Sequence, residues 1–180
     1  RGVLYGDDTP PANGCTVIRA MFNTAATIRQ SLTVIETSDP PLPAASSSLV
    51  TWIFKQIGEV VFLPSSNMDA STALCGSGPA FFLLMVEAAA DGGVAMGLPR
   101  AEAQKMAAQS MMGAAGMVLS GQHPAVLKDK VCTPGGCTIG GLMVLEEGGV
   151  RGCVGRAVRE ATVVASQLGQ GAKLVNGTRH

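Results

Sequence analysis

The stretch GPAFFLLMVEAAADGGVAMGLPRAEAQKMAAQSMMGAAGMVL occupies residues 78–119, and its apolar spacing and prolines predict two consecutive helices. The first covers about 79–96, because Pro79 suits the first turn of a helix. The second begins at Pro99, and Glu102 lies in its first turn, where a carboxylate favours the helix dipole. This stretch therefore predicts a helical domain in the second part of the chain.

The second of these helices is apolar on almost every side. Its apolar residues are Met106, Ala107, Ala108, Met111, Met112, Ala114, Ala115, Met117, Val118 and Leu119. A helix that is apolar all round must be buried all round, and the rest of this segment offers few helices to cover it. We therefore expect a second copy of the chain to cover it in an obligate homodimer, with Gly113 and Gly116 allowing the backbones to approach closely.

The remaining sequence divides into two parts of different character. Helices at about 124–131, 139–147 and 151–168 complete an all-helical domain over residues 65–180. Residues 1–64 instead alternate short strands and helices, which is typical of α/β architecture. These α/β elements are too few to close a doubly wound sheet, so the chain is expected to be mostly helical.

The N-terminal part contains five expected elements. They are strands at 15–20, 32–35 and 60–63, and helices at 24–30 and 49–57. Pro40, Pro41 and Pro43 interrupt the chain before the second helix, and residues 44–48 are interpreted as a small polar loop. Gly58 ends that helix before the last strand.

Composition excludes several classes of protein. Hydrophobic residues make up 47% and charged residues 14%, which is too apolar for a disordered chain. Lys plus Arg number 13, as do Asp plus Glu, so no basic surface for nucleic acid is expected. The charge-free run 106–127 contains Gln, Ser, Gly, His and Pro and makes a poor membrane span. The first residues, RGVLYGDD, lack the pattern of a signal peptide, so we expect neither nucleic acid nor membrane as a partner.

An odd number of cysteines argues against a disulfide framework. The cysteines are Cys15, Cys75, Cys132, Cys137 and Cys153. They form no CxxC motif, and only His123 and His180 could add imidazole ligands, so no metal site is expected. Reduced thiols favour a cytoplasmic location, with a mitochondrial one left open. Cys132 and Cys137 are interpreted as small packing residues.

The loop TPGGCT at residues 133–138 is the most informative candidate for a binding site. Gly135 and Gly136 can adopt positive φ, and Thr138 suits the N-cap of the helix that follows. The glycines at 140–141 leave the free N–H groups of the first turn unshielded, so a carboxylate or phosphate could reach them. The alternative is a glycine-rich connection between two tightly packed helices, and the loop alone leaves both open.

Two other patterns suggest catalysis less strongly. The segment CGSGP at residues 75–79 resembles a nucleophile elbow, but that motif requires glycine where Cys75 and Pro79 stand, so helix capping by Ser77 and Gly78 is the interpretation. No histidine is evident as its base.

Glu87 and Asp91 lie four residues apart on one helix face and could do acid–base work. The alternative is that they pair with Arg100 or Lys105. His123, which precedes a proline, is interpreted as a helix cap.

Three segments resemble pyrroline-5-carboxylate reductases. Residues 68–100, MDASTALCGSGPAFFLLMVEAAADGGVAMGLPR, are similar to one signature of that family. Residues 123–152, HPAVLKDKVCTPGGCTIGGLMVLEEGGVRG, are similar to a second, and Asn23-Thr24 in RAMFNTA resembles a third. The resemblance covers about 15–168, and the cysteines in these motifs are similar to those of fungal members.

The resemblance implies a fold and an activity. Members of the family carry a Rossmann domain that binds NADPH or NADH, followed by an all-helical dimerisation domain like the C-terminal domain of 6-phosphogluconate dehydrogenase. They reduce 1-pyrroline-5-carboxylate to L-proline, the final step of proline biosynthesis. The implied assembly is a homodimer, possibly a ring of dimers.

The resemblance also implies roles for individual residues. Thr138 and the backbone of Cys137 would hold the substrate carboxylate, with Thr133, Gly135 and Gly136 forming the rest of that loop. Asn23 and Thr24 would lie on the cofactor side, with Lys130 near the nucleotide. No side chain is identified as a catalytic acid or base.

The sequence departs from the family at its N-terminal side. No GxGxxG occurs, although this phosphate-binding turn is typical of Rossmann domains, and Phe22 stands where proline is frequent in the family. We expect a fragment in which residues 1–64 are the C-terminal part of a Rossmann-type domain. The alternatives are a non-catalytic dimerisation module and a different Rossmann-type dehydrogenase with a helical C-terminal domain.

Overall fold

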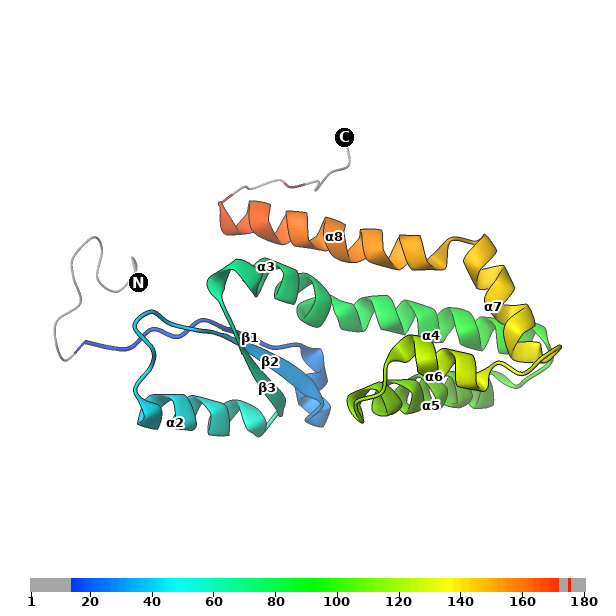
Figure 1. The fold of residues 1–180 in the computed structure, drawn as a ribbon, viewed down its shortest axis with the longest axis horizontal. Coiled ribbons are helices and arrows are strands. Elements are labelled where there is room, and N and C mark those ends of the chain that lie inside the picture. The colour runs from blue at the N-terminus through cyan, green and yellow to red at the C-terminus, as the bar shows by residue number, and fades with distance from the viewer. Residues whose placement is uncertain (1–13, 172–174, 176–180) are drawn as a thin grey trace. The chain divides into compact units, whose positions relative to one another are not determined.

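A computed structural model of the chain describes residues 14–171 and residue 175 (Figure 1). The chain forms two compact units, one running to Ser77 and resuming at Thr162, the other spanning Gly78–Ala161. The first residues, RGVLYGDD, for which no signal peptide is expected, and His180 lie outside the described residues. The domain boundary expected after residue 64 stays a prediction, and compact packing groups residues 65–77 with the first unit.

The first unit is built on a three-stranded sheet. Its strands are β1 (Ala20–Met21), β2 (Ser31–Glu36) and β3 (Gly58–Leu63), in the order β1-β2-β3. β1 is antiparallel to β2, whereas β2 and β3 are parallel. Parallel neighbours require a crossover, which is provided by helix α2 (Ala44–Lys55). The central strand β2 holds the core, since Thr33 and Ile35 are 0% exposed.

Several expectations for this unit were wrong. Gly58 does not end the helix before it, since α2 ends at Lys55 and Gly58 is already the first residue of β3. The strand expected at 15–20 forms only at Ala20–Met21, because the Arg19 carbonyl accepts the last ladder bond from the N–H of Glu36, at 2.9 Å, where β2 ends. Residues 44–48 are not a loop but the first part of α2, because Pro43 occupies the N-cap with φ −51° and the small residues after it continue as helix.

Gly58 begins β3 in a conformation that only glycine adopts readily. Its φ is +147°, and a Cβ at this position would lie 1.9 Å from the backbone carbonyl oxygen of Ser31. Ser31 begins β2 and is paired with Gly58 in the sheet register, and its N–H donates to the Ile57 carbonyl at 3.0 Å. The start of the parallel pair therefore depends on the missing side chain.

A run of helical turns leads from the sheet into the second unit. It consists of η2 (Ser65–Asn67), α3 (Met68–Ser71) and η3 (Thr72–Gly76), the last of which is a π turn. Met68 and Ala73 are each 1% exposed and anchor this run in the core of the first unit.

The second unit is helical, as the sequence predicts. Its helices are α4 (Gly78–Ala95), α5 (Arg100–Leu119), α6 (Pro124–Val131), α7 (Cys137–Glu147) and α8 (Val150–Gly169), whose last residues belong to the first unit. α4 and α5 pack side by side through Gly93, whose open Cα faces Leu98 and Ala103. Asp91 pairs with Arg100 at 2.5 Å, which confirms the structural interpretation of that carboxylate.

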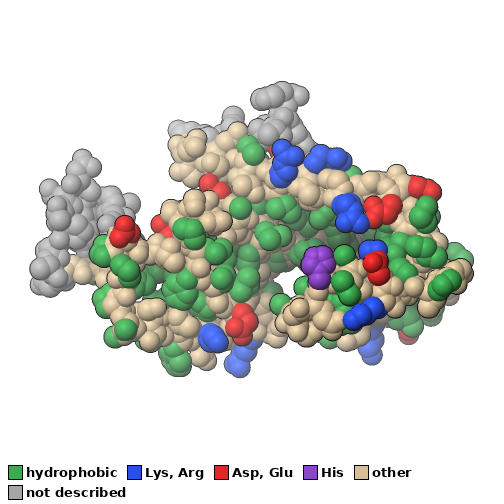
Figure 2. Space-filling model, in the orientation of Figure 1, with side chains coloured by type: hydrophobic (Ala, Val, Ile, Leu, Met, Phe, Trp, Pro, Cys, Tyr) green, Lys and Arg blue, Asp and Glu red, His purple; other side chains and the backbone are tan. Residues whose placement is uncertain are grey.

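Helix α5 is not covered by the rest of the described chain. Ala103 is its only buried residue, whereas Met112 is 62% and Leu119 is 87% exposed. Figure 2 shows apolar side chains, in green, at many places on the face of the molecule that it draws. The described stretch Ser65–Ala95 is also long and apolar enough to cross a membrane, judged on length and composition alone. The expected absence of a membrane partner therefore stays a prediction.

Candidate functional site

The loop between α6 and α7 forms a tight turn at the start of a helix. The N–H of Gly136 donates to the carbonyl of Thr133 at 3.0 Å. Pro134 occupies the second position of this turn and Gly135, with φ +68°, the third, which is the residue pattern of a type II turn. The turn leaves Gly136 extended, at φ −77° and ψ 165°, so that α7 begins at the next residue.

The N-cap expected at Thr138 was wrong. The N-cap of α7 is Gly136, and Thr138 is already the second helical residue, because the turn allows the helix to begin two residues earlier. Gly136 has no side chain, so no capping bond satisfies the first N–H groups of the helix. The correction strengthens the anion-site interpretation, since those N–H groups point out of the helix end with no side chain capping them.

The glycines of this loop differ in what surrounds them. A Cβ at Gly136 would lie 2.3 Å from Thr133 Oγ1, which places that hydroxyl beside the helix start. Within the described chain, a Cβ at Gly135, Gly140 or Gly141 would meet no atom within 4 Å. Tight packing of neighbouring helices in the same chain therefore does not account for these three glycines.

Helix α6 leads into the loop and carries Lys130 in its last turn. Its N-cap is His123, whose Nδ1 accepts the N–H of Ala125 at 3.2 Å, which confirms the capping interpretation. Lys130 Nζ donates to Gln122 Oε1 at 3.0 Å, so this ammonium is held close to the start of α6.

The two cysteines that flank the loop have different surroundings. Cys132 is half-buried and its thiol donates to the Lys128 carbonyl at 3.2 Å, in keeping with a packing role. Cys137 was expected to pack as well, but its side chain is exposed, because the first position of α7 has no neighbour covering it in the described chain.

Asn23 lies at the other predicted site, two residues after the end of β1. Its side-chain Oδ1 accepts the N–H of Ala25 at 3.0 Å and so caps η1 (Thr24–Ile28). Its Nδ2 donates to the carbonyl of Cys75 at 2.9 Å, and its own N–H donates to Ser31 Oγ at 3.1 Å. Thr24 follows as an exposed residue. This corner belongs to the first unit and the 133–138 loop to the second.

The segment around Ser77 is not a nucleophile elbow. That motif joins a strand to a helix, whereas residues 72–76 before Ser77 are helical. The N–H of Ser77 donates to the carbonyl of Thr72 at 3.0 Å, which closes the π turn. Burial raises the pKa of the Cys75 thiol, and the side-chain hydrogen bond from Asn23 to the thiol lowers it by less. The thiol therefore stays protonated at neutral pH and donates to the Leu32 carbonyl at 2.9 Å.

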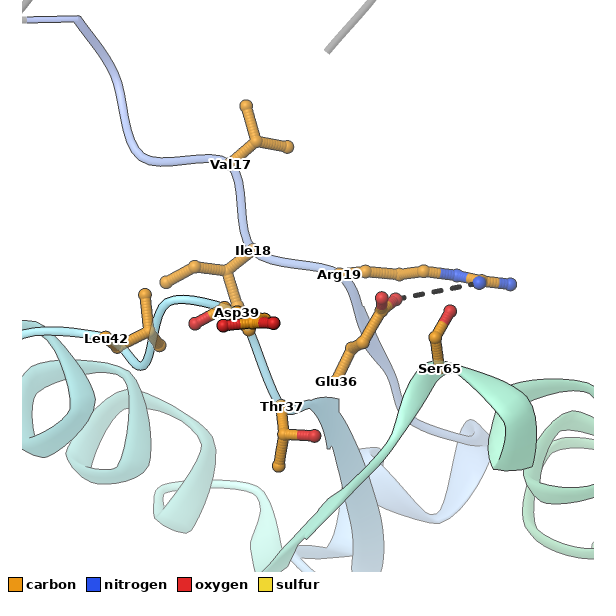
Figure 3. A pocket seen from close by; sticks show the side chains of 9 residues that line it. Val17, Ile18, Arg19, Glu36, Thr37, Asp39, Leu42 and Ser65 are labelled. Atoms are coloured by element: carbon orange, nitrogen blue, oxygen red, sulfur yellow. Dashed lines mark ion pairs between the residues drawn. The ribbon is translucent and has the colours of Figure 1, made fainter.

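A cavity that sequence reasoning missed lies at the opposite end of the strands from Asn23. It has a volume of about 800 Å³ at the carboxyl ends of the parallel strands (Figure 3). Arg19 extends across it toward Glu36, with the two side chains 3.6 Å apart, and lies 3.9 Å from Asp69. The polar run Thr37–Asp39 directly after β2 is the signal that could have predicted it. No three ligand side chains come together for a metal within residues 14–171.

Comparison with known proteins identifies relatives of the chain. Residues 65–168 match the family model described as "Pyrroline-5-carboxylate reductase dimerisation". The pyrroline-5-carboxylate reductase of Lophium arboricola is 74% identical, over 99% of this chain and 57% of the relative. That of Neurospora crassa is 73% identical, over 91% of this chain and 50% of the relative. The chain thus spans about half the length of the curated relatives it matches.

Solved structures show the same similarity. The pyrroline carboxylate reductase of Plasmodium falciparum, solved with NADP bound, matches with a TM-score of 0.79 and 29% identity, over 86% of this chain and 63% of that one. The pyrroline-5-carboxylate reductase of Coxiella burnetii matches with a TM-score of 0.78 and 30% identity, over 84% of this chain and 56% of that one. The predicted order, an α/β part followed by a helical part, is confirmed.

Proposed function

The chain belongs to the pyrroline-5-carboxylate reductase family, and on that basis we propose that it takes part in the NAD(P)H-dependent reduction of 1-pyrroline-5-carboxylate to L-proline. The observation that carries this proposal is the uncapped start of α7 beside the Thr133–Gly136 turn. The proposed place of action is the cytoplasm.

The α7 start has the chemistry that a small carboxylate requires. The N–H groups of Cys137 and Thr138 lie in the first turn of α7, where backbone donors and the helix dipole both favour a negative charge. The Thr133 hydroxyl lies beside Gly136 and adds a further donor. We assign the substrate carboxylate to this loop, with Thr133, Gly135, Gly136, Cys137 and Thr138 around it.

The described residues suit one end of a nicotinamide cofactor but not its pyrophosphate. The corner at Asn23 and Thr24 follows the carboxyl end of β1 and is polar and uncharged, which suits an amide-bearing ring. The pyrophosphate of a dinucleotide normally lies on a glycine-rich turn, and the sequence holds no GxGxxG. We therefore assign Asn23 and Thr24 to the nicotinamide end, with Lys130 on the nucleotide side, and assign no residue to the pyrophosphate.

The mechanism asks more of alignment than of acid–base chemistry. Hydride donation is the chemistry that the nicotinamide supplies when bound. A protonated imine already has an electrophilic carbon, so the protein contributes by fixing the substrate through its carboxylate and by holding it in one orientation. This accounts for a site in which no residue is assigned as a general acid or base.

Thr138→Ala is expected to weaken the binding of L-proline by roughly ten- to a hundredfold, because a hydroxyl bond to a carboxylate contributes about 1.5–3 kcal/mol. NADPH affinity should stay within twofold. Calorimetric titration of the chain with each ligand measures both values, and Thr138→Ser, which keeps the hydroxyl, is the matched control. Equal losses for the two ligands would contradict the assignment.

We also propose that the chain pairs with a second copy of itself through its exposed apolar helices. The family model that matches residues 65–168 describes a dimerisation region, and the described chain leaves apolar side chains on α4, α5 and α7 uncovered. These include Leu83, Leu84, Met106, Met112, Leu119 and Val144. A ring of dimers is the finer form of this proposal.

Leu84→Lys is expected to convert a dimer into a monomer, because it places a charge in a surface that association would bury. Leu84 is 66% exposed in the single chain. Trp52→Lys is the matched control, since Trp52 on α2 is 64% exposed but lies in the first unit. Light scattering after size exclusion reads the mass of each variant, and a dimer that survives Leu84→Lys refutes this surface.

A dimerisation module without turnover is the second candidate function. The observation in its favour is the combination of an uncovered α5 with a sequence that lacks the phosphate-binding turn. Loss of NADPH absorbance in the presence of 1-pyrroline-5-carboxylate, measured on chain of known mass, separates the two. Turnover supports the reductase, whereas a folded dimer without turnover supports the module.

A further inference from the structure

The carbonyl of Cys75 lies where the π turn η3 meets α4. In a continuous α-helix this carbonyl would accept a hydrogen bond from the N–H of the residue four positions later. That residue is Pro79, which has no N–H. In this sequence the carbonyl of Cys75 therefore has no N–H donor four residues later.

The donor that replaces it comes from the first corner of the sheet. Asn23 Nδ2 donates to the Cys75 carbonyl at 2.9 Å, across 52 residues of sequence, and lies 3.7 Å from the Cys75 sulfur. Asn23 Oδ1 is held at the same time by the N–H of Ala25. Because both ends of the amide are bonded, its plane is fixed.

Cys75 is held in place from a second direction. Its thiol donates to the carbonyl of Leu32 in β2 at 2.9 Å, and the π turn before it is closed by the bond from Ser77 N–H to the Thr72 carbonyl. The Cys75 carbonyl, which orients Asn23, is thus tied to the central strand of the sheet. It keeps its place independently of the Asn23 side chain.

We propose that Pro79 and Cys75 are positioning residues. Because Pro79 has no N–H, the Cys75 carbonyl stays available as a hydrogen-bond acceptor. This carbonyl orients the Asn23 amide and the start of η1 at the proposed nicotinamide site. The inference rests on the proposed function, in which Asn23 and Thr24 border the cofactor. A purely structural role for Pro79 would not couple its missing N–H to the ligand affinity of the corner at Asn23, whereas this inference does.

Pro79→Ala tests the proposal, because it restores an N–H that competes with Asn23 for the Cys75 carbonyl. The Tm should change little, because Pro79 lies in the first turn of α4, where proline is tolerated and alanine is a good helix former. The Kd for NADPH should rise by up to about tenfold, since an amide that has lost its fixed acceptor must be ordered again when the ligand binds. L-proline affinity should stay within twofold.

Two further variants and one spectroscopic measurement sharpen the result. Pro99→Ala, at the N-cap of α5, removes a proline from another helix start and should leave both affinities unchanged. Pro79→Ser restores the same N–H as Pro79→Ala without touching Asn23, and should weaken NADPH binding to the same extent. The side-chain amide protons of Asn23 should exchange slowly with solvent in the original chain and faster in Pro79→Ala.

Each outcome decides between the claims. If the original chain binds no NADPH, the proposed function of the corner and this inference fall together. If it binds NADPH and Pro79→Ala leaves both the affinity and the Asn23 exchange unchanged, only the inference is overturned. Equal losses of NADPH and L-proline affinity with a lower Tm would show a merely structural proline. If Pro79→Ala does not fold, Pro79→Ser decides by the same two affinities.

Discussion

Gly58→Ala should unfold the first unit at ordinary temperatures, with a loss of about 4 kcal/mol or more in the free energy of unfolding. The added Cβ would lie 1.9 Å from the Ser31 carbonyl oxygen and 2.6 Å from the Ser31 nitrogen, both backbone atoms that are fixed by the sheet. The φ of +147° adds strain, because residues with a Cβ rarely adopt it. Denaturant unfolding followed by circular dichroism measures the loss.

Gly155→Ala is the matched control for that substitution. Gly155 lies inside α8, where a Cβ would meet no atom within 4 Å of the described chain. The same chemical change should here stabilise the chain by about 1 kcal/mol, because alanine is the better helix former. If both variants lose stability alike, the close approach at Gly58 is not what governs the start of β3.

Gly136→Ala should reduce L-proline affinity by about a hundredfold, ~3 kcal/mol, while the helices remain folded. Its Cβ would lie 2.3 Å from Thr133 Oγ1 and 3.1 Å from the Thr133 carbonyl oxygen, so the turn must open. An opened turn moves the Thr133 hydroxyl away from the start of α7 and adds a methyl group beside the free N–H groups. Calorimetric titration of the chain with L-proline measures the effect.

A double variant separates the clash from the lost hydroxyl. Thr133→Ala alone removes a donor, and combined with Gly136→Ala it also removes the atom that the new Cβ would strike first. The double variant should therefore bind L-proline more tightly than Gly136→Ala alone. If it binds no better, the turn at residues 133–136 does not control the site.

The helices could be predicted where proline and apolar spacing act locally. Pro79 and Pro124 lie in the first turns of α4 and α6, and Glu102 lies in the first turn of α5, each within one or two residues of the expected place. Strand β1 could not be predicted, because its length is decided by where β2 ends and not by the β-branched run before it.

The candidate site was predictable in part for the same reason. The turn at residues 133–136 follows from Pro134 and Gly135, which set its backbone angles directly. The N-cap was misplaced, since the extended conformation of Gly136 results from the closed turn as a whole. The contact between Asn23 and Cys75 joins residues 52 positions apart, and no local pattern reports it.

Because α5 is uncovered in the single chain, the stability of the proposed dimer depends on the protein concentration. A chain that buries this helix only against another copy gains free energy by mass action, so its Tm should rise with the logarithm of protein concentration. On dilution, or during synthesis before a partner is available, the same methionine-rich surface faces water. For the proposed dimer to form in a cell, two copies must therefore meet faster than chaperones or proteases capture one.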